Sequence, residues 1–318
     1  MAANYEVIIV GARVAGSLLA TLLGQRGHRV LLLDRDKFPS DALSTHFFRA
    51  PALRIFKEAG VLEQALATAP KLTVNYNVID GIVFPEPVDR PEDFPFYMCI
   101  RRITLDDILV RRAKETPGVE MHEGAKVEAL LREGARVNGV RWNGADGRQE
   151  ASAKVVIGAD GINSLVAKEA GAQVEQEEPI NRTMYYAYYR GIKPSDGPAA
   201  EFHYRENNLV YCFPTDGGLT LLAASVPLAF FGEFKSDSEG RFEQETHSMT
   251  ALAPRLKEAK REGPVRGTGS IPGRLRIPYG DGWALVATPE WCWILGPGKA
   301  SIRLLPMPAI WPGSCMNF

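Results

Sequence analysis

Two short glycine-containing turns, far apart in the chain, have the residue types and spacing of a nucleotide-binding site. The first segment, residues 5–17, reads Y-E-V-I-I-V-G-A-R-V-A-G-S, and the second, residues 155–164, reads V-V-I-G-A-D-G-I-N-S. Each follows an apolar β-branched run and precedes a helical pattern. Free N–H groups and a partial positive charge at a helix N-terminus favour phosphate. The first segment therefore predicts the start of a dinucleotide-binding βαβ unit.

The residues of the first turn have separate steric and polar tasks. Gly11 allows the tight turn after the buried strand, while Ala15 and Gly16 are small enough for the following helix to pack close to that strand. A second buried strand over residues 29–33 ends at Asp34. An acid roughly 20 residues after the glycine turn can accept a hydrogen bond from a ribose hydroxyl.

One position departs from the G-x-G-x-x-G pattern, because Arg13 replaces the middle glycine. An arginine here must either turn its side chain aside or use it on the cofactor, and the sequence leaves both options open. A chance glycine turn in another α/β protein is the alternative. The strand, helix, second strand and acid in the expected order disfavour it.

Composition excludes several function classes. The 318 residues carry 37 Lys and Arg against 38 Asp and Glu, a formal net charge of −1 that does not favour a nucleic-acid partner. No segment is long and apolar enough to be predicted as a transmembrane helix, and no signal peptide is apparent. The cysteines show no metal-ligand spacing, so we expect no metal and a cytoplasmic location; they are Cys99, Cys212, Cys292 and Cys315.

The periodicity predicts elements that must position these turns. We expect a strand over residues 77–84 followed by a proline-rich surface loop, and a helix over 104–115 that Thr104 caps and whose first turn holds Asp106 and Asp107. We also expect a hairpin from residues 126–131 and 136–142, antiparallel strands within 182–226, a helix over 239–256 and a strand over 283–286.

These elements predict an α/β Rossmann-like nucleotide-binding domain with a parallel sheet, interrupted by an antiparallel β-sheet substrate domain of α+β type. The expected division is given by residue numbers. The nucleotide-binding domain takes 1–72 and 101–181, the substrate domain 73–100 and 182–272, the return strand 273–286 and a separate tail 287–318.

The ordered set of motifs resembles the FAD-dependent monooxygenases of the aromatic-hydroxylase type and their geranylgeranyl-reductase-like relatives. G-A-R-V-A-G-S with Asp34 resembles the turn that binds the ADP part of FAD, and R-R-I-T-L-D at residues 101–106 resembles an Arg-x-x-Leu-Asp helix start. G-A-D-G at residues 158–161 resembles the family's D-G motif. The second turn, in this order and at this distance, narrows the ligand to FAD. The similarity covers roughly residues 4–286.

The resemblance implies which residues would contact the cofactor. Arg102 matches an arginine that contacts FAD. Asp160 matches an aspartate that acts at the sites of both FAD and the nicotinamide donor. Val127 matches a position whose backbone contacts the adenine. Residues 38–46, ending at His46, resemble a loop near the flavin ring. The implied cofactor-binding set is Gly11, Ala12, Arg13, Ala15, Gly16, Asp34, Arg35, Arg102, Val127, Asp160 and Gly161.

Each assignment has an ordinary structural alternative. Arg102 could be a solvated arginine in front of a helix, and Asp160 could be a turn aspartate that caps the next helix, near Asn163. For His46 the packed-loop interpretation is favoured over a catalytic one. Alternating aromatic residues of the antiparallel strands, such as Tyr186 and Tyr188, could line a substrate pocket, although for most of them we favour sheet core.

The resemblance implies an NAD(P)H-dependent monooxygenase in which NADH or NADPH reduces FAD. A flavin C4a-hydroperoxide formed with O₂ then hydroxylates or epoxidises a small organic substrate. Two alternatives stay open: an FAD-dependent reductase of isoprenoid double bonds, and a truncated, inactive gene product.

The family's next motif, G-D-A followed by P-x-x-G-x-G, is absent after the strand at residues 283–286. One extra base after the Val286 codon allows the following codons to read V-G-D-A-G-M-V-L-D-P-G-P-G-Q-G-I. We therefore hypothesise that residues 287–318 are an out-of-frame tail, a divergent C-terminus being the alternative. On this hypothesis the ADP end of the site remains, and the chain as written binds FAD weakly or not at all.

Overall fold

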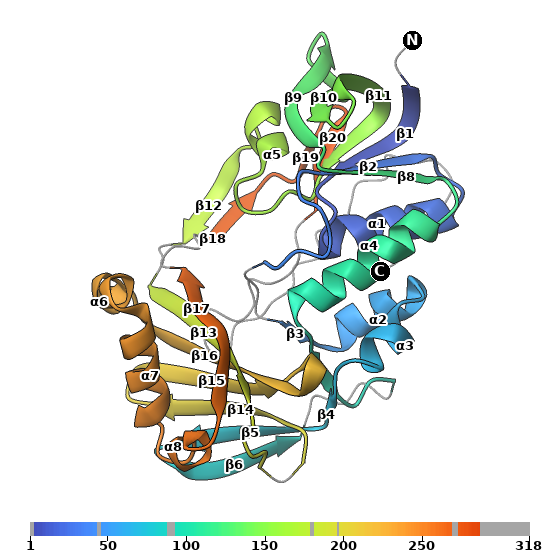
Figure 1. Cartoon of the computed structure of the whole chain (residues 1–318). Helices are drawn as coiled ribbons and strands as arrows, with labels where there is room; N and C mark the ends of the chain where they lie inside the picture. Colours follow the sequence, from blue (N-terminus) through green and yellow to red (C-terminus); the bar gives the residue numbers. More distant parts are fainter. Residues whose placement is uncertain are drawn as a thin grey trace. The chain divides into compact units, whose positions relative to one another are not determined.

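The computed structural model describes residues 3–42, 46–87, 93–178, 181–195, 197–268 and 273–286 (Figure 1). The expectations for the tail at 287–318, and for positions 43–45 of the loop that ends at His46, lie outside the described residues. Among the helices that the structure describes, none has the length and apolar character needed to cross a membrane.

An eight-stranded sheet contains the predicted parallel strands. Its order is β19-β20-β11-β1-β2-β8, and β10 and then β9 continue from β11 (Figure 1). Strand β1 pairs in parallel with β2 and β11, and β20 pairs in parallel with β11. The antiparallel pair β9–β10 confirms the predicted hairpin. The bounds are β1 Ala3–Val10, β2 Val30–Asp34, β8 Val119–Glu123, β9 Lys126–Glu133, β10 Arg136–Gly144, β11 Gly147–Gly158, β19 Tyr279–Gly280 and β20 Trp283–Leu285.

Strand β1 is buried on both faces, as its unbroken apolar run predicts. Val7 and Ile9 pack in a hydrophobic cluster with residues of α1 (Val14–Gln25) and α4 (Arg102–Glu115). Ile8 and Val10 pack in a second cluster with residues of β9, β10 and α5 (Leu165–Ala170). The parallel sheet is therefore the middle layer of three.

Small elements connect the parallel sheet to the rest of the chain. A three-stranded sheet has the order β3-β7-β4, and a two-stranded one joins β12 to β18. Helices α2 and α3 pack in one cluster with residues of α1 and α4. The bounds are β3 Phe47–Phe48, α2 Ala50–Glu58, α3 Leu62–Leu66, β4 Lys71–Leu72, β7 Tyr97–Cys99, β12 Val174–Glu178 and β18 Gly273–Arg276.

A seven-stranded sheet of order β17-β13-β16-β15-β14-β5-β6 includes the strands predicted within residues 182–226. Neighbouring strands are antiparallel except β14 and β5, which are parallel. Helices α6, α7 and α8 cover one face (Figure 1). The bounds are β5 Val74–Ile79, β6 Ile82–Pro87, β13 Arg182–Arg190, β14 Ala199–Arg205, β15 Asn208–Pro214, η1 Asp216–Gly218, β16 Leu219–Pro227, η2 Leu228–Phe230, α6 Phe231–Ser236, α7 Ser238–Ser248, α8 Ala253–Leu256 and β17 Lys260–Thr268.

Three sequence predictions are wrong in detail. The strand expected over 77–84 is a hairpin of β5 and β6, because Asp80 and Gly81 adopt positive φ values and turn the chain. The helix expected over 239–256 is two helices, and Pro254 lies in the first turn of α8. Thr104 does not cap α4; Arg101 occupies the N-cap position, and the first turn holds neither Asp106 nor Asp107.

A charged network lies inside the helix-covered part of this sheet. Glu201, only 3% exposed, accepts hydrogen bonds from the Arg255 guanidinium at 2.6 and 2.8 Å and from Ser195 Oγ at 2.8 Å. His203 Nε2 lies 2.9 Å from the other carboxylate oxygen. Burial raises the pKa of Glu201, but the bonds from His203 and Arg255 outweigh burial and hold that pKa at about 2.

This network predicts an acid-sensitive contribution to stability. The pKa of Glu201 falls from 4.5 to about 2 on folding. A depressed carboxyl pKa stabilises the fold fully above the unfolded-state value, and the contribution is lost as the pH falls from about 4.5 towards 2. The shift corresponds to roughly 3 kcal/mol. Urea unfolding between pH 7 and pH 3 should show a steeper loss of stability for the wild type than for Glu201→Gln, and equal slopes would contradict the assignment.

Candidate functional site

The two glycine turns lie side by side at the carboxyl edge of the parallel sheet. Val10 and Gly158 are register partners, and the Ala159 N–H donates to the Val10 carbonyl at 2.7 Å. Gly11 has φ +101°, and a Cβ added to it would lie 2.4 Å from the Ala159 carbonyl oxygen. Only glycine fits this contact, so the two segments that the sequence singled out form one surface.

The N-terminus of α1 opens directly from the first turn. A Cβ on Gly16 would lie 1.7 Å from the Gly11 carbonyl oxygen, so the helix can begin here only without that atom. No side chain caps α1 at its N-cap residue, Arg13. Uncapped first-turn N–H groups are a donor set for an anion. The residues present therefore fit the pyrophosphate of a dinucleotide.

Asp34 fixes the glycine turn through hydrogen bonds to its backbone. Its carboxylate accepts the N–H groups of Ala12 at 2.6 Å and Asp36 at 2.8 Å, and the side chain is buried. Burial raises the pKa of Asp34 despite these two bonds. The carboxylate fixes the turn relative to the end of β2, and its contact with a ribose stays a prediction.

The Arg13 side chain pairs with protein groups, and its contact with the cofactor stays a prediction. Its guanidinium donates to Asp106 at 2.8 Å and to Asp36 and Ser40 at 2.9 Å each. The guanidinium also lies 5.6 Å from the centre of the Phe38 ring. The Arg13 side chain thus bridges α1, α4 and the loop after β2.

Arg102 is 4% exposed, so the alternative of a solvated arginine is wrong. It donates to both oxygens of Asp106, from Nε at 2.9 Å and from Nη2 at 3.1 Å. Asp106 is fully buried and accepts hydrogen bonds from Arg13 as well as Arg102. The sequence predicts Asp106 as a first-turn acid and as part of the Arg-x-x-Leu-Asp helix start, but not as the shared partner of the two arginines. The four-residue spacing in Arg-x-x-x-Asp was the available signal, since it places both side chains on one helix face.

Asp160 caps the next helix. Its carboxylate accepts the Ser164 hydroxyl at 2.5 Å and the N–H groups of Leu165 and Val166 at 2.7 and 3.2 Å. The helix begins at Leu165, with Ser164 as its N-cap. Gly161, with φ +78°, has no atom within 4 Å of an added Cβ. The capping alternative therefore describes the observed contacts of Asp160, and its cofactor role stays a prediction.

Two further residues of the predicted cofactor-binding set are Val127 and Arg35. The Ala125 N–H donates to the Asp34 carbonyl at 2.7 Å, which brings the start of β9, and with it the buried Val127, to the end of β2. The Arg35 side chain is 78% exposed and lies 4.0 Å from Asp36.

His46 is buried and contacts the antiparallel sheet, as the favoured packed interpretation expects. Its Nε2 lies 2.7 Å from the Tyr188 hydroxyl, and its ring meets the Tyr186 ring edge-on at 5.2 Å. Phe202 and Phe213 of this sheet contact the Phe47 ring, Tyr211 packs against both of them, and all three residues of the sheet are buried. Most of the alternating aromatic residues are therefore core.

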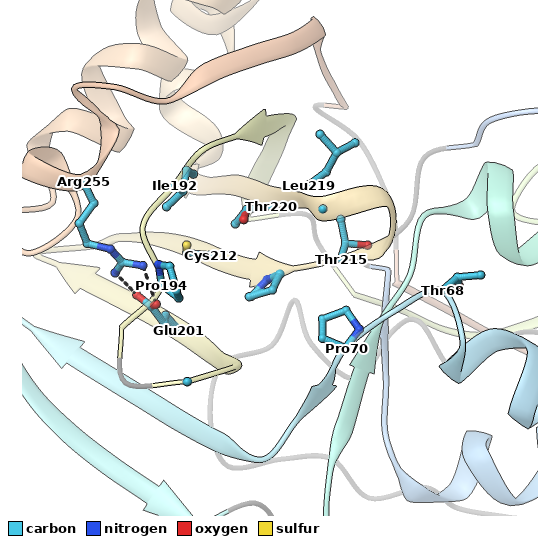
Figure 2. Close-up of a pocket in the computed structure, with 13 residues that line it drawn as sticks. Thr68, Pro70, Ile192, Pro194, Glu201, Cys212, Thr215, Leu219, Thr220 and Arg255 are labelled. Atoms are coloured by element: carbon cyan, nitrogen blue, oxygen red, sulfur yellow. Dashed lines mark hydrogen bonds and ion pairs between the residues drawn. The ribbon is translucent and has the colours of Figure 1, made fainter.

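A cavity of about 330 Å³ lies at one end of the antiparallel sheet (Figure 2). Ile192, Pro194, Thr215 and Thr220 line it, and the Glu201–Arg255 pair forms part of its wall. None of its lining residues belongs to the glycine turns or to α1. The cavity is thus separate from the nucleotide-binding surface.

Fold and site together define a dinucleotide-binding α/β protein with an attached antiparallel sheet. The sequence model of a family described as "FAD binding domain" matches residues 4–259, and the chain belongs to this family. The predicted resemblance to FAD-dependent hydroxylase-like proteins is confirmed.

Curated relatives carry different activities. A digeranylgeranylglycerophospholipid reductase of Methanothermobacter thermautotrophicus is 31% identical over 173 residues, which cover 54% of this chain and 43% of the reductase. A 1H-pyrrole-2-carbonyl-[peptidyl-carrier protein] brominase of Pseudoalteromonas luteoviolacea is 22% identical over 89% of this chain and 70% of the brominase. The chain thus spans less than half of the reductase that it matches.

Solved structures share the fold. A myxobacterial chondrochloren halogenase superposes with a TM-score of 0.78 at 23% identity, covering 89% of this chain and 68% of the halogenase. A probable FAD-dependent monooxygenase from Pseudomonas aeruginosa gives a TM-score of 0.73 at 20% identity, covering 89% and 78%. These likenesses confirm the predicted fold class.

The tight contact at Gly16 gives a stability prediction. Gly16→Ala should destabilise the chain at or above the upper end of the range of about 1–3 kcal/mol that overpacking costs, because the new methyl overlaps the Gly11 carbonyl. Thermal unfolding measures the loss. The matched control is Gly232→Ala in α6, where an added Cβ meets nothing within 4 Å and the change should cost nothing or stabilise by up to about 1 kcal/mol. Equal effects would contradict the contact.

The buried carboxylate of α4 gives a second prediction. Asp106→Ala removes a buried carboxylate that accepts hydrogen bonds from both Arg13 and Arg102, so it should destabilise the chain by about 3–5 kcal/mol in urea unfolding. The neighbouring variant Asp107→Asn breaks only the pair with the exposed Arg111 and should change stability by less than about 1 kcal/mol. A small effect of Asp106→Ala would show that the two arginines find other partners.

Proposed function

We propose that this protein is an FAD-dependent oxidoreductase, acting as an NAD(P)H-dependent monooxygenase that hydroxylates or epoxidises a small organic substrate. The single observation that carries the proposal is the contact of the two glycine turns beside the uncapped N-terminus of α1. Membership of the FAD binding domain family supports the identity of the nucleotide. Bound FAD would supply the hydride and oxygen chemistry, and the chain would bind and orient the reactants.

The described residues divide the binding task among themselves. The first-turn N–H groups of α1 would bind the pyrophosphate. Asp34 would contact the ribose, and the backbone of Val127 would contact the adenine. Arg102, held by Asp106, would add a fixed positive charge. The electron donor, NADH or NADPH, is part of the proposal, and so are the domain boundaries given above.

We place the substrate against the face of the antiparallel sheet opposite α6–α8. The loop after β2 reaches this face twice, because Asp41 pairs with Arg266 of β17 and His46 meets Tyr188 of β13. His46 and Tyr186 are buried at this face, beside the partly exposed Asp41–Arg266 pair. A dry pocket is what oxygen transfer to an organic substrate requires.

A reductase that saturates isoprenoid double bonds is the second candidate. The 31% identity to the digeranylgeranylglycerophospholipid reductase favours it. An oxygen electrode separates the two, because a monooxygenase consumes O₂ in proportion to NAD(P)H and a reductase does not.

Nucleotide titration tests the proposal. The purified chain should bind ADP saturably, and FAD should compete for the same site, because the described residues build the ADP end. A second chain with one base added after the Val286 codon should bind FAD more tightly if the out-of-frame hypothesis holds. Absence of saturable ADP and FAD binding in both chains would overturn the proposed function, and equal FAD affinity would overturn the frame hypothesis alone.

A further inference from the structure

Asp216 has a buried carboxylate with five hydrogen-bond donors, although it lies in a turn. The turn connects β15 to β16, and Asp216 is 2% exposed. Its Oδ1 accepts the backbone N–H of Arg101 at 2.7 Å and the Thr215 hydroxyl at 3.0 Å. Its Oδ2 accepts Arg101 Nε at 2.9 Å, Arg101 Nη2 at 2.8 Å and the Thr104 hydroxyl at 2.6 Å.

Four of these five donors belong to the start of α4. Arg101 is the N-cap residue of the helix and Thr104 lies in its first turn. A carboxylate next to a helix N-terminus is also favoured by the helix dipole. Asp216 thus fixes the backbone, the guanidinium and a hydroxyl of one helix end at the same time.

The turn that carries Asp216 is itself rigidly placed. Gly217 and Gly218 both have φ +67°, a conformation that glycine adopts without strain. The Thr215 hydroxyl oxygen also lies 3.1 Å from the Cys99 carbonyl oxygen, and Arg190 Nη1 donates to the Gly217 carbonyl at 3.2 Å. The antiparallel sheet therefore presents the carboxylate at a set position.

The helix end that Asp216 fixes also carries the charged pair beside the glycine turn. Arg102 follows Arg101 directly, and Asp106 one turn later accepts both Arg102 and Arg13. Arg13 is the N-cap residue of α1. Two groups of hydrogen bonds, linked by the backbone of α4, therefore join the β15–β16 turn to the start of α1.

Stability alone does not account for this arrangement. Burial raises the pKa of Asp216, but the bonds from Arg101 and Thr104 outweigh burial and leave that pKa below its ordinary value, so the group is charged at neutral pH. A buried ion pair is often no more stabilising than apolar side chains of the same size, because both charges lose their hydration. What such a pair gives reliably is a fixed direction and distance between its partners.

We propose that Asp216 is a positioning residue for the cofactor site. From the antiparallel sheet it fixes the start of α4, so that Arg102 and Asp106 stay in place beside the nucleotide-binding turn. The inference rests on the proposed function, since it takes FAD as the ligand of that turn. It assigns to a residue of the antiparallel sheet a role at a site built by the parallel one.

The test combines a binding measurement with one that needs no ligand. Asp216→Asn should raise the dissociation constants of FAD and ADP by about tenfold, measured by fluorescence titration and by competition. The same variant without ligand should show amide hydrogen exchange at residues 102–106 accelerated by about tenfold, with β1 and β11 unchanged. ADP binding that fails already in the wild type would count against the proposed function, and the exchange data would still test the contact.

The matched control is Glu201→Gln, which neutralises another buried carboxylate of the same sheet. The donors to Glu201 are Ser195, His203 and Arg255, none of which belongs to α4. This variant should lower stability yet change the dissociation constants by less than about twofold. Equal loss of binding in the two variants would show that Asp216 acts only through global stability and would overturn the inference.

A double-mutant cycle tests whether Asp216 affects nucleotide binding through its contact with Arg101. If Asp216 acts through Arg101, then Arg101→Gln added to Asp216→Asn should weaken FAD binding little further, since the contact is already broken. Full additivity of the two changes would contradict a shared route.

Discussion

The contact of Gly11 with Ala159 is the constraint on which the rest of the site depends. It brings together two segments almost 150 residues apart in the chain, and it leaves no room for a side chain at the point of contact. The parallel register of β1 and β11 places both turns at the same sheet edge. Once the turns meet, α1 has to begin next to the Gly11 carbonyl, with its first N–H groups directed outwards. A donor set for phosphate follows from backbone packing alone.

Charged side chains then fix the position of this backbone. Asp34 accepts the Ala12 N–H from one side, and Asp106 accepts Arg13 and Arg102 from the other. Arg13 stands where the family pattern has glycine, and its guanidinium pairs with the carboxylates of Asp106 and Asp36. A bulky residue is accommodated here because α4 and the loop after β2 supply its partners. The departure from the motif is therefore compatible with a working turn.

The parts of the fold that local sequence predicts are those held by local patterns. The apolar runs of β1, β2 and β20 and the alternating strands near residue 200 were predictable, since strand burial follows from periodicity. Strand β17 was missed because it is a largely exposed edge strand rich in charge. The sequence predicts one strand where β5 and β6 form a hairpin, because the turn between them is only Asp80 and Gly81. The contact of Asp216 with Arg101 spans 115 residues, and no spacing rule reaches across such a distance.

Long-range polar contacts also decide how the two sheets act on each other. Asp216 reaches α4, Tyr188 reaches His46, and Arg266 reaches Asp41, so three separate elements of the antiparallel sheet meet segments next to the nucleotide-binding turns. Each contact involves a charge or a ring nitrogen whose partner is fixed by direction, and not only by apolar area. Sheets joined by apolar area alone can slide at small cost, whereas directional bonds at three points resist both sliding and rotation. A movement of the antiparallel sheet would therefore have to break these bonds or carry the start of α4 and the loop after β2 with it.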